Sequence, residues 1–155
     1  MMRFSSLDKT VQTLLQIASV SAKNYRHSQV NVEHLLLILI KEPDDTIAQI
    51  GKEIPIDFEK AKDRLDLFLR SKSKSILFGP KNTVFVSAKV KRILDKSEAE
   101  ARGLGDKDVL TEHVLLSVLR EAPTTAAQVF SETNATYENV IETVKRIREK
   151  HIQKD

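Results

Sequence analysis

The sequence predicts an all-α protein built from two pseudo-twofold related four-helix repeats, about eight helices in all, joined by an extended linker. Only four glycines and four prolines occur in 155 residues, which disfavours a turn-rich β fold. A shift of 79 residues aligns the two halves without a gap. Between Thr10–Glu59 and Lys89–Glu138, 14 of 50 aligned residues are identical, where chance gives about three. A single duplication of this length indicates two similar lobes packed together.

Each copy contains four segments with the apolar spacing of a helix. The first copy begins with apolar residues on one helical face, at Val11, Leu14, Leu15, Ala18, Ala22 and Tyr25. The segment from about Val32 to Lys41 is almost wholly apolar and is therefore expected at the centre of the fold. A short helix is predicted around Thr46 to Lys52. The fourth segment carries Phe58, Ala61, Leu65 and Phe68 on one face, and the second copy repeats all four patterns.

The predicted helix starts agree in chemistry between the copies. Each pair of aligned starts offers a side-chain oxygen that can accept a hydrogen bond from a free backbone N–H group. These pairs are Asp8 with Ser87, Asp45 with Thr124, and Asp57 with Thr136. The residue changes while the capping chemistry stays, which indicates the same helix boundaries in both lobes.

The chain is predicted to form one domain with four parts. Repeat one spans 4–70, a linker spans 71–85, repeat two spans 86–149, and a charged tail spans 150–155. Within the linker, Val84–Val86 can pair briefly as a strand or lie extended, and we expect the extended form.

The net charge is +3, and its distribution argues against nucleic-acid binding. Residues 70–85 and 145–155 hold the basic excess, whereas the two main blocks are mildly acidic. A nucleic-acid reader concentrates Lys and Arg on its folded docking face. The basic stretches are therefore expected to be a solvated linker and a solvated tail. The absence of cysteine, of a long apolar run and of a signal-peptide core predicts a cytoplasmic protein without membrane contact.

No arrangement of residues typical of an active site is present in the sequence. The dipeptide Glu33-His34 recurs as Glu112-His113, and a zinc site at the pseudo-twofold axis is one interpretation of this repeat. We prefer a structural role, because a glutamate early in a helix is favoured by the macrodipole and a buried histidine can bond to a loop carbonyl. No phosphate-binding glycine loop and no Ser/His/Asp arrangement occurs. The sequence therefore predicts a binding module with no cofactor and no metal, and not an enzyme.

The duplicated pattern resembles the Clp N-terminal domain, the substrate- and adaptor-binding module of ClpC- and ClpB-type AAA+ ATPases. The pattern is Ala-x₁₀-Glu-His-Leu-Leu-Leu, from Ala22 to Leu37 in copy one, with Ala101, Glu112-His113 and Leu115-Leu116 in copy two. The resemblance covers about residues 4–149. ClpC-type relatives commonly have Thr-Glu-His in both copies, whereas copy one here has Val32-Glu33-His34, so that Asn31 is the available cap.

This resemblance implies a polar pocket in each lobe that receives arginine or phosphoarginine of a client. The matching residues are Ser87, Thr111 and Glu112 in one pocket and Glu33 and Asp8 in the other. A carboxylate binds a guanidinium bidentately, and a helix N-terminus with a hydroxyl group binds phosphate. Because Asp8 repels phosphate, the pocket with Glu112, expected at an exposed helix start, is predicted to bind phosphoarginine better. Alternatively, these residues only cap helices. A second candidate site is an apolar groove between the lobes that would hold unfolded segments or an adaptor helix.

The resemblance implies that the chain recognises client proteins for ATP-driven unfolding by the ATPase rings of a Clp-type unfoldase or disaggregase. The alternative is a stand-alone accessory protein that docks on the Clp protease core. The charged ending favours an excised domain. The expected partners are unfolded or tagged clients, adaptor proteins and Clp ATPase rings in the same or a partner chain, with no nucleic acid and no membrane. In a eukaryote, an organelle stroma or matrix is the alternative compartment.

Overall fold

A computed structural model describes residues 7–75, 78 and 83–154, and within these residues the chain forms eight helices. The first lobe contains α1 (Lys9–Asn24), β1 (Gln29–Val30), α2 (Val32–Lys41), α3 (Asp45–Glu53) and α4 (Phe58–Ser71). The second contains β2 (Phe85–Val86), α5 (Ala88–Gly103), α6 (Thr111–Glu121), α7 (Pro123–Val129) and α8 (Tyr137–Lys154). The predicted all-α fold of two four-helix repeats is confirmed.

The predicted part boundaries fall partly outside the described residues. Residues 4–6 at the start of repeat one, 76–77 and 79–82 in the linker, and 155 at the end lie there. The residues assigned to a charged tail continue the helix, because α8 runs to Lys154. In the described part of the chain, no helix combines the length and the apolar character needed to cross a membrane.

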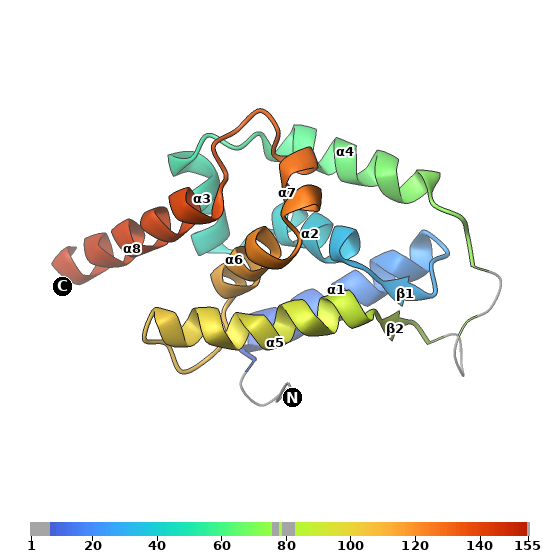
Figure 1. The fold of residues 1–155 in the computed structure, drawn as a ribbon, viewed down its shortest axis with the longest axis horizontal. Coiled ribbons are helices and arrows are strands. Elements are labelled where there is room, and N and C mark those ends of the chain that lie inside the picture. The colour runs from blue at the N-terminus through green and yellow to red at the C-terminus, as the bar shows by residue number, and fades with distance from the viewer. Residues whose placement is uncertain (1–6, 76–77, 79–82, 155) are drawn as a thin grey trace.

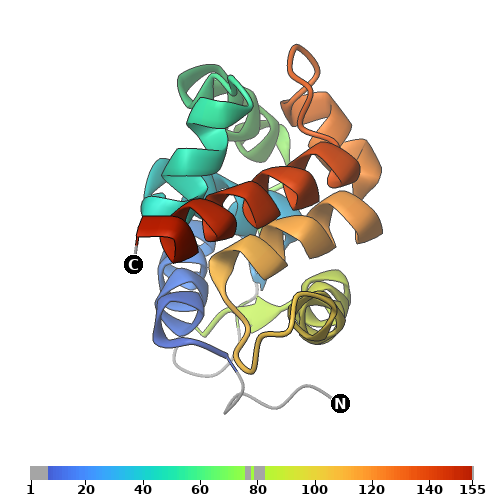
Figure 2. The ribbon, with the colours of Figure 1, turned by 90° about the vertical axis from the view of Figure 1, so that its left-hand side faces the viewer.

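Helices α2 and α6 lie at the centre of the molecule (Figure 1). Helices α1 and α5 lie on one side of them, and α4 and α7 lie on the other (Figure 2). Every residue of α2 from His34 to Ile40 is buried, and so is every residue of α6 from Thr111 to Leu119. A helix that is apolar on all sides is stable only when other helices cover it on all sides, and this explains its central place.

Short backbone pairings connect the two lobes and overturn one expectation. Phe85–Val86 does not simply lie extended, because it pairs in parallel with Gln29–Val30. On the other side of the pseudo-twofold axis, Leu7 forms a parallel bridge with Val109. A strand of two residues leaves no periodicity in the sequence. It forms here because these backbone groups find partners in the other lobe that they would otherwise lack.

Four of the six predicted helix caps are confirmed and two are wrong. Asp8, Asp57, Ser87 and Thr136 accept hydrogen bonds from backbone N–H groups at the starts of α1, α4, α5 and α8. Helix α3 is capped by Asp44 and not by Asp45, because Asp44 Oδ1 accepts from Ile47 N–H at 3.0 Å. Helix α7 begins at Pro123, one residue before the predicted cap Thr124. Proline already has the helical φ and lacks the N–H that a cap would bind, so it starts the helix itself.

The lobes differ where their third and fourth helices meet. In the first lobe the Phe58 ring lies over Gly51, close enough that a Cβ atom there would come within 2.6 Å of it. In the second lobe, Phe130 takes the position equivalent to Gly51 and is itself buried. Tyr137, the equivalent of Phe58, instead donates a hydrogen bond to Glu100 Oε2 at 2.6 Å. The two lobes therefore differ in the aromatic residue at this junction, which is Phe58 at the start of α4 in the first lobe and Phe130 at the end of α7 in the second.

Candidate functional site

The five predicted site residues lie in two groups, and each group contains residues from both lobes. The Ser87 N–H donates to Val30 O at 3.0 Å, which places Ser87 beside the start of α2 and Glu33. The Asp8 N–H donates to Val109 O at 2.9 Å, which places Asp8 beside the start of α6, where Thr111 and Glu112 lie. The predicted grouping of Ser87 with Glu112 and of Asp8 with Glu33 is therefore wrong. The reason is the backbone pairing between the lobes, which places the start of α5 beside the start of α2 and the start of α1 beside the start of α6.

Glu33, in the first turn of α2, is partly accessible, with its side chain 14% exposed. Its Oε2 accepts a hydrogen bond from Thr125 Oγ1 of the second lobe at 3.1 Å. Its Oε1 lies 3.9 Å from Lys72 Nζ, just past the end of α4. One carboxylate therefore lies between a hydroxyl and an ammonium group, with the Ser87 cap at the neighbouring helix start. We call Glu33, Lys72, Ser87 and Thr125 the Glu33 site.

Glu112 lies in a different environment, because its side chain is only 7% exposed. Arg148 of α8 donates from Nη2 to Glu112 Oε2 at 3.1 Å, and the same nitrogen lies 2.7 Å from Asp106 Oδ2. Burial disfavours the charged form of Arg148, but the hydrogen bonds to Asp106 and Glu112 outweigh it and raise the pKa of the guanidinium group. The expectation that Glu112 lies at an exposed helix start is wrong, because α8 covers it. An arginine of the chain itself already occupies this carboxylate.

The other residues beside Glu112 also form hydrogen bonds within the domain or carry a negative charge. Thr111 Oγ1 donates to Asp44 Oδ2 of the first lobe. Asp8 Oδ2 accepts from the Thr10 N–H at 3.1 Å and caps α1. This second site therefore gathers the carboxylates of Asp8, Asp44 and Glu112 around a buried helix start, an arrangement that disfavours an added anion.

Sequence reasoning missed Lys72, Thr125, Asp44 and Arg148 as neighbours of the predicted residues. One of them, Arg148, could have been found from the alignment of the two copies. Arg148 aligns with Leu69, which is fully buried, so the duplication places a cation where the first lobe has a core residue, although the Arg148 side chain stays 27% exposed. A cation at such a position needs an internal carboxylate, since burying an unpaired charge is costly.

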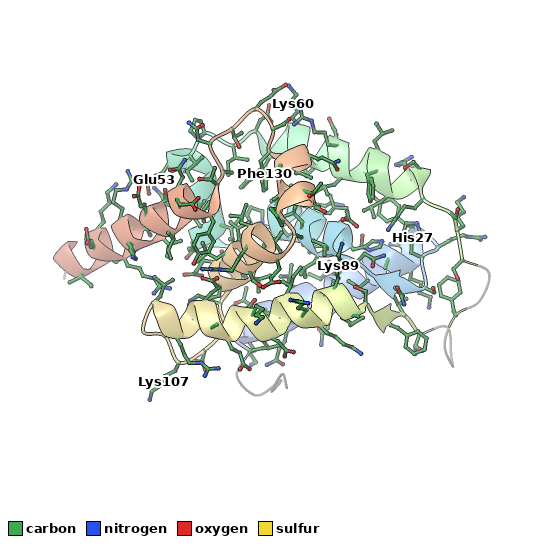
Figure 3. All side chains as sticks on the ribbon, viewed as in Figure 1. His27, Glu53, Lys60, Lys89, Lys107 and Phe130 are labelled. Carbon is green, nitrogen blue, oxygen red and sulfur yellow. The ribbon has the colours of Figure 1, made fainter. Side chains whose placement is uncertain are left out.

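His34 and His113 of the repeated dipeptide form the same bond at Nδ1, but their Nε2 atoms have different partners. Each accepts a hydrogen bond at Nδ1 from the backbone N–H three residues earlier, His34 from Asn31 at 2.9 Å and His113 from Leu110 at 2.8 Å. The expected bond to a loop carbonyl is therefore wrong, and the Asn31 side chain makes no capping bond. His113 Nε2 lies 2.7 Å from Asp106 Oδ2. His34 Nε2 instead lies 2.8 Å from Nδ1 of His27, which is at the α1 end shown in Figure 3.

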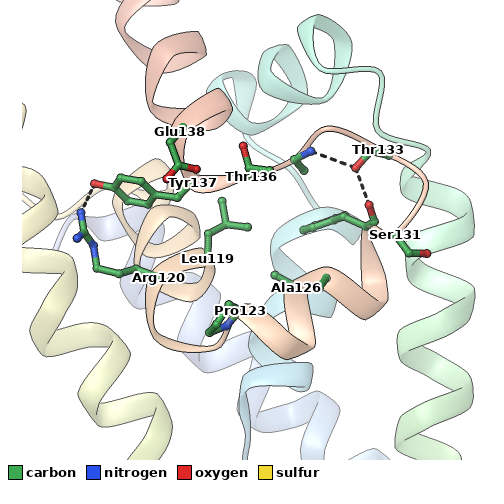
Figure 4. Close-up of a pocket in the computed structure, with 12 residues that line it drawn as sticks. Leu119, Arg120, Pro123, Ala126, Ser131, Thr133, Thr136, Tyr137 and Glu138 are labelled. Carbon is green, nitrogen blue, oxygen red and sulfur yellow. Dashed lines mark hydrogen bonds between the residues drawn. The ribbon is translucent and has the colours of Figure 1, made fainter.

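An apolar pocket of about 640 Å³ opens between α6, α7 and the start of α8 (Figure 4). Leu119, Ala126 and Phe130 line it, and Tyr137 at its edge is held by its bonds to Arg120 and Glu100. All its lining residues belong to the second repeat, so it is not the predicted groove between the lobes. At the boundary between the lobes, α4 contacts α7 through a hydrogen bond from Arg64 Nη1 to Val129 O at 3.1 Å.

The fold and the helix-start sites define a class of protein, a duplicated helical domain with polar side chains grouped where the helix starts of its two lobes meet. Residues 6–151 match the family described as the Clp repeat (R) N-terminal domain, and the chain belongs to this family. Such a domain is a binding domain of AAA+ ATPases and is not itself catalytic.

The chain is 31% identical over 130 residues to the ATP-binding subunit ClpC of the ATP-dependent Clp protease of Staphylococcus aureus (strain USA300). This match covers 84% of the chain but only 15% of the relative's length. A structure from "preliminary structural investigations of a malarial protein secretion system" has a TM-score of 0.78 and 25% identity, covering 94% of this chain and 96% of that one. The ClpV N-domain in complex with a VipB peptide has a TM-score of 0.67 and 14% identity, covering 88% of this chain and 82% of that one.

Proposed function

We propose that this domain is the substrate- and adaptor-binding N-terminal module of a Clp-type AAA+ unfoldase or disaggregase. In this role it recognises unfolded or tagged client proteins, directly or through adaptor proteins, for unfolding by ATPase rings in the same or a partner chain. Membership of the Clp N-terminal domain family supports this proposal. So does the ClpV N-domain of the same fold, which was solved with a peptide bound. The module acts in the cytoplasm, or in an organelle stroma or matrix, without nucleic acid or membrane.

The observation that best supports a specific binding site is that the Glu33 carboxylate is partly accessible and lies beside Ser87. The Glu33 carboxylate can accept the guanidinium of a client arginine bidentately. Lys72, whose side chain is 36% exposed, is suited to a phosphate carried by that guanidinium, whereas the buried Ser87 hydroxyl already caps α5 and has only its own proton left to donate. The Glu33 site therefore has complementary groups for both halves of a phosphoarginine side chain.

The second pocket is a weaker candidate for the same ligand. A client arginine would have to displace Arg148 from Glu112, and a phosphate would meet the carboxylates of Asp8 and Asp44. The sequence-based expectation that the Glu112 pocket binds phosphoarginine better thus loses its physical basis. We assign binding to the Glu33 site and a structural role to Glu112.

Calorimetric titration of phosphoarginine into the wild-type domain, Glu33→Gln and Glu112→Gln tests this assignment. Losing one charged hydrogen-bond partner costs about 1.5–3 kcal/mol, so Glu33→Gln is expected to weaken binding roughly ten- to a hundredfold. Glu112→Gln is expected to change affinity little, and its melting temperature shows whether the fold is intact. A loss confined to Glu112→Gln, or no binding by the wild type, would refute the Glu33 site.

The stand-alone accessory protein remains the alternative function. The chain covers 15% of the length of the ClpC relative, and the genomic reading frame beyond Asp155 decides between the two. Walker motifs in that frame support the module of a longer ATPase, whereas a stop codon supports a separate protein.

A further inference from the structure

A polar cavity lies beside the C-terminal half of α2, where Leu37 and Lys41 line it. Its volume is about 700 Å³, within the range of pockets that take small ligands or a few residues of a peptide. The C-terminal ends of α1, α2 and α4 form its walls, and Leu37 and Tyr25 supply apolar surface. Four cationic side chains line it, and they are Arg26, Lys41, Arg70 and Lys74. We call this cavity the cationic pocket.

Among the described residues, Asp66 is the one carboxylate that lines the cationic pocket, and it is already engaged. Asp66 accepts a hydrogen bond from the Tyr25 hydroxyl and lies 2.8 Å from Arg70 Nε. The hydrogen bond from Tyr25, with that from Arg70, lowers the pKa of Asp66, so this carboxyl group is charged at neutral pH. In the described ranges of the chain, no carboxylate lies within ion-pair distance of Arg26, Lys41 or Lys74. Three of the four cations therefore have no ion-pair partner, although Lys41 lies near enough to Asp66 to help lower the pKa of that carboxyl group.

Helix dipoles alone do not explain so many cations in one place. Three helix ends contribute roughly one and a half negative charges, since each carries about half a charge. Asp66 adds one more, and four cationic side chains still leave the pocket positive. Moreover, Lys74 lies three residues beyond the end of α4, where the effect of the helix dipole has largely fallen off.

Arg26 lies in the pocket despite an unfavourable backbone conformation. Its φ is +62°, in the left-handed region that glycine enters freely and other residues enter only with strain. The equivalent residue in the second lobe is Gly105, with φ of +78°. The left-handed residue ends α1, because the His27 N–H then bonds to Ala22 O. Glycine would do this without strain, so the first lobe keeps an arginine where glycine fits more easily.

The repeated fold does not by itself produce this charge. The positions in the second copy that align with the four cations hold Gly105, Arg120, Glu149 and Gln153, which have no net charge. The cationic pocket is therefore a property of the first lobe alone, built by its own side chains.

We propose that the cationic pocket binds a short acidic peptide segment of a client or adaptor protein. A segment with two or three carboxylates matches the three unpaired cations, and Leu37 and Tyr25 can contact its aliphatic carbons. A long polyanion such as nucleic acid fits less well, because residues 42–66 of the same lobe carry eight carboxylates and only four cations. None of the residues of the Glu33 site lines this pocket, although its Lys72 lies between Arg70 and Lys74 along the chain, and binding here goes beyond the proposed function.

The test uses fluorescence anisotropy of a fluorescein-labelled octaglutamate peptide at about 50 mM salt, where screening is weak. The double variant Lys41→Gln/Lys74→Gln is expected to weaken binding roughly tenfold, since each lost charge pair contributes up to about threefold. The matched control is Lys89→Gln/Lys107→Gln, which removes the same charge from exposed residues of the second repeat (Figure 3) and leaves the affinity within about twofold.

Arg26→Gly gives an independent result if the double variant fails to fold. It relieves the backbone strain and removes a cation, so it is expected to raise the melting temperature by about 2–4 °C while weakening octaglutamate binding. Equal losses from the pocket and control pairs, or no saturable binding by the wild type, overturn the proposal. Tighter binding of a single-stranded oligonucleotide to the same residues also overturns the peptide assignment. Each outcome leaves the phosphoarginine test at Glu33 unaffected, because that test uses another ligand and other variants.

Discussion

His27 Nδ1 lies 2.8 Å from His34 Nε2, so two buried imidazole rings share one hydrogen bond. His34 Nδ1 accepts from the Asn31 N–H, and a neutral His34 therefore carries its proton on Nε2 and donates it to His27. A neutral His27 must then carry its own proton on Nε2, which is buried without a partner among the described residues. The pair can form this network only while both rings are neutral.

The first prediction is that the stability of the domain decreases as the pH falls from about 6.5 to about 4. Burial, with the nearby His27 and Lys72, lowers the pKa of His34 to about 4 from an ordinary 6.5. Because the unfolded chain then binds the proton more readily, the stabilisation is complete above pH 6.5 and is lost as the pH falls through this window. The loss from His34 is about 3 kcal/mol. Urea unfolding at a series of pH values measures it.

His27→Asp is the variant that isolates this effect. It places a carboxylate where the second lobe has Asp106, next to the equivalent histidine. The charged carboxylate favours a protonated His34, so stability is expected to fall less steeply with decreasing pH. His151→Gln, in the exposed end of α8, serves as a control that keeps the wild-type slope. A His27→Asp profile parallel to the wild-type profile would contradict the assignment.

The second prediction is that Arg148 and Glu112 stabilise the fold as a coupled pair. Arg148→Met leaves the carboxylates of Glu112 and Asp106 without their cation and is expected to cost about 2–4 kcal/mol. Glu112→Gln alone costs less, because Asp106 still neutralises the arginine. A double-mutant cycle measured by urea unfolding is expected to show a coupling of about 1–2 kcal/mol. Additive losses would mean that the two side chains act independently.

The duplication allowed the helices to be predicted. Which helix starts lie side by side depends on backbone contacts that leave no pattern in the sequence. Helical periodicity placed the apolar faces, and the near-continuous apolar run identified the central α2. The exchange of Ser87 and Asp8 between the lobes rests on backbone bonds to Val30 and Val109, which any residue can form. Glu33 and Glu112 are the same residue in the same motif. Arg148 of α8 covers Glu112, whereas Glu33 lies beside Lys72 and Thr125 and stays more exposed.

The third prediction concerns the close approach of Phe58 to Gly51. A Cβ atom at residue 51 would lie 2.6–3.2 Å from three atoms of the Phe58 ring and force that ring to move. After the gain in helix propensity is subtracted, Gly51→Ala is expected to destabilise the domain by about 0.5–2 kcal/mol. Gly103→Ala, at the end of α5, has open space around the new atom and is expected to stabilise by about 0.5–1 kcal/mol. Thermal unfolding of both variants distinguishes them. Adding Phe58→Leu to Gly51→Ala is expected to recover part of the loss, and the same sign of effect from both glycines would contradict the packing argument.

The last prediction tests the exchanged helix starts through charge alone. Aspartate and serine are about equally good N-caps, so Ser87→Asp and Asp8→Ser are each expected to change stability by less than about 0.5 kcal/mol. Ser87→Asp adds a negative charge beside Glu33, and it is therefore expected to weaken phosphoarginine binding while leaving the affinity for free arginine unchanged or higher. Asp8→Ser removes a charge beside Glu112, away from the Glu33 site, and is expected to leave both affinities near the wild-type values. Calorimetry with the two ligands checks the four combinations. If Asp8→Ser instead improved phosphoarginine binding and Ser87→Asp had no effect, the phosphate would have to bind at the Glu112 side, where Arg148 would then need to move away.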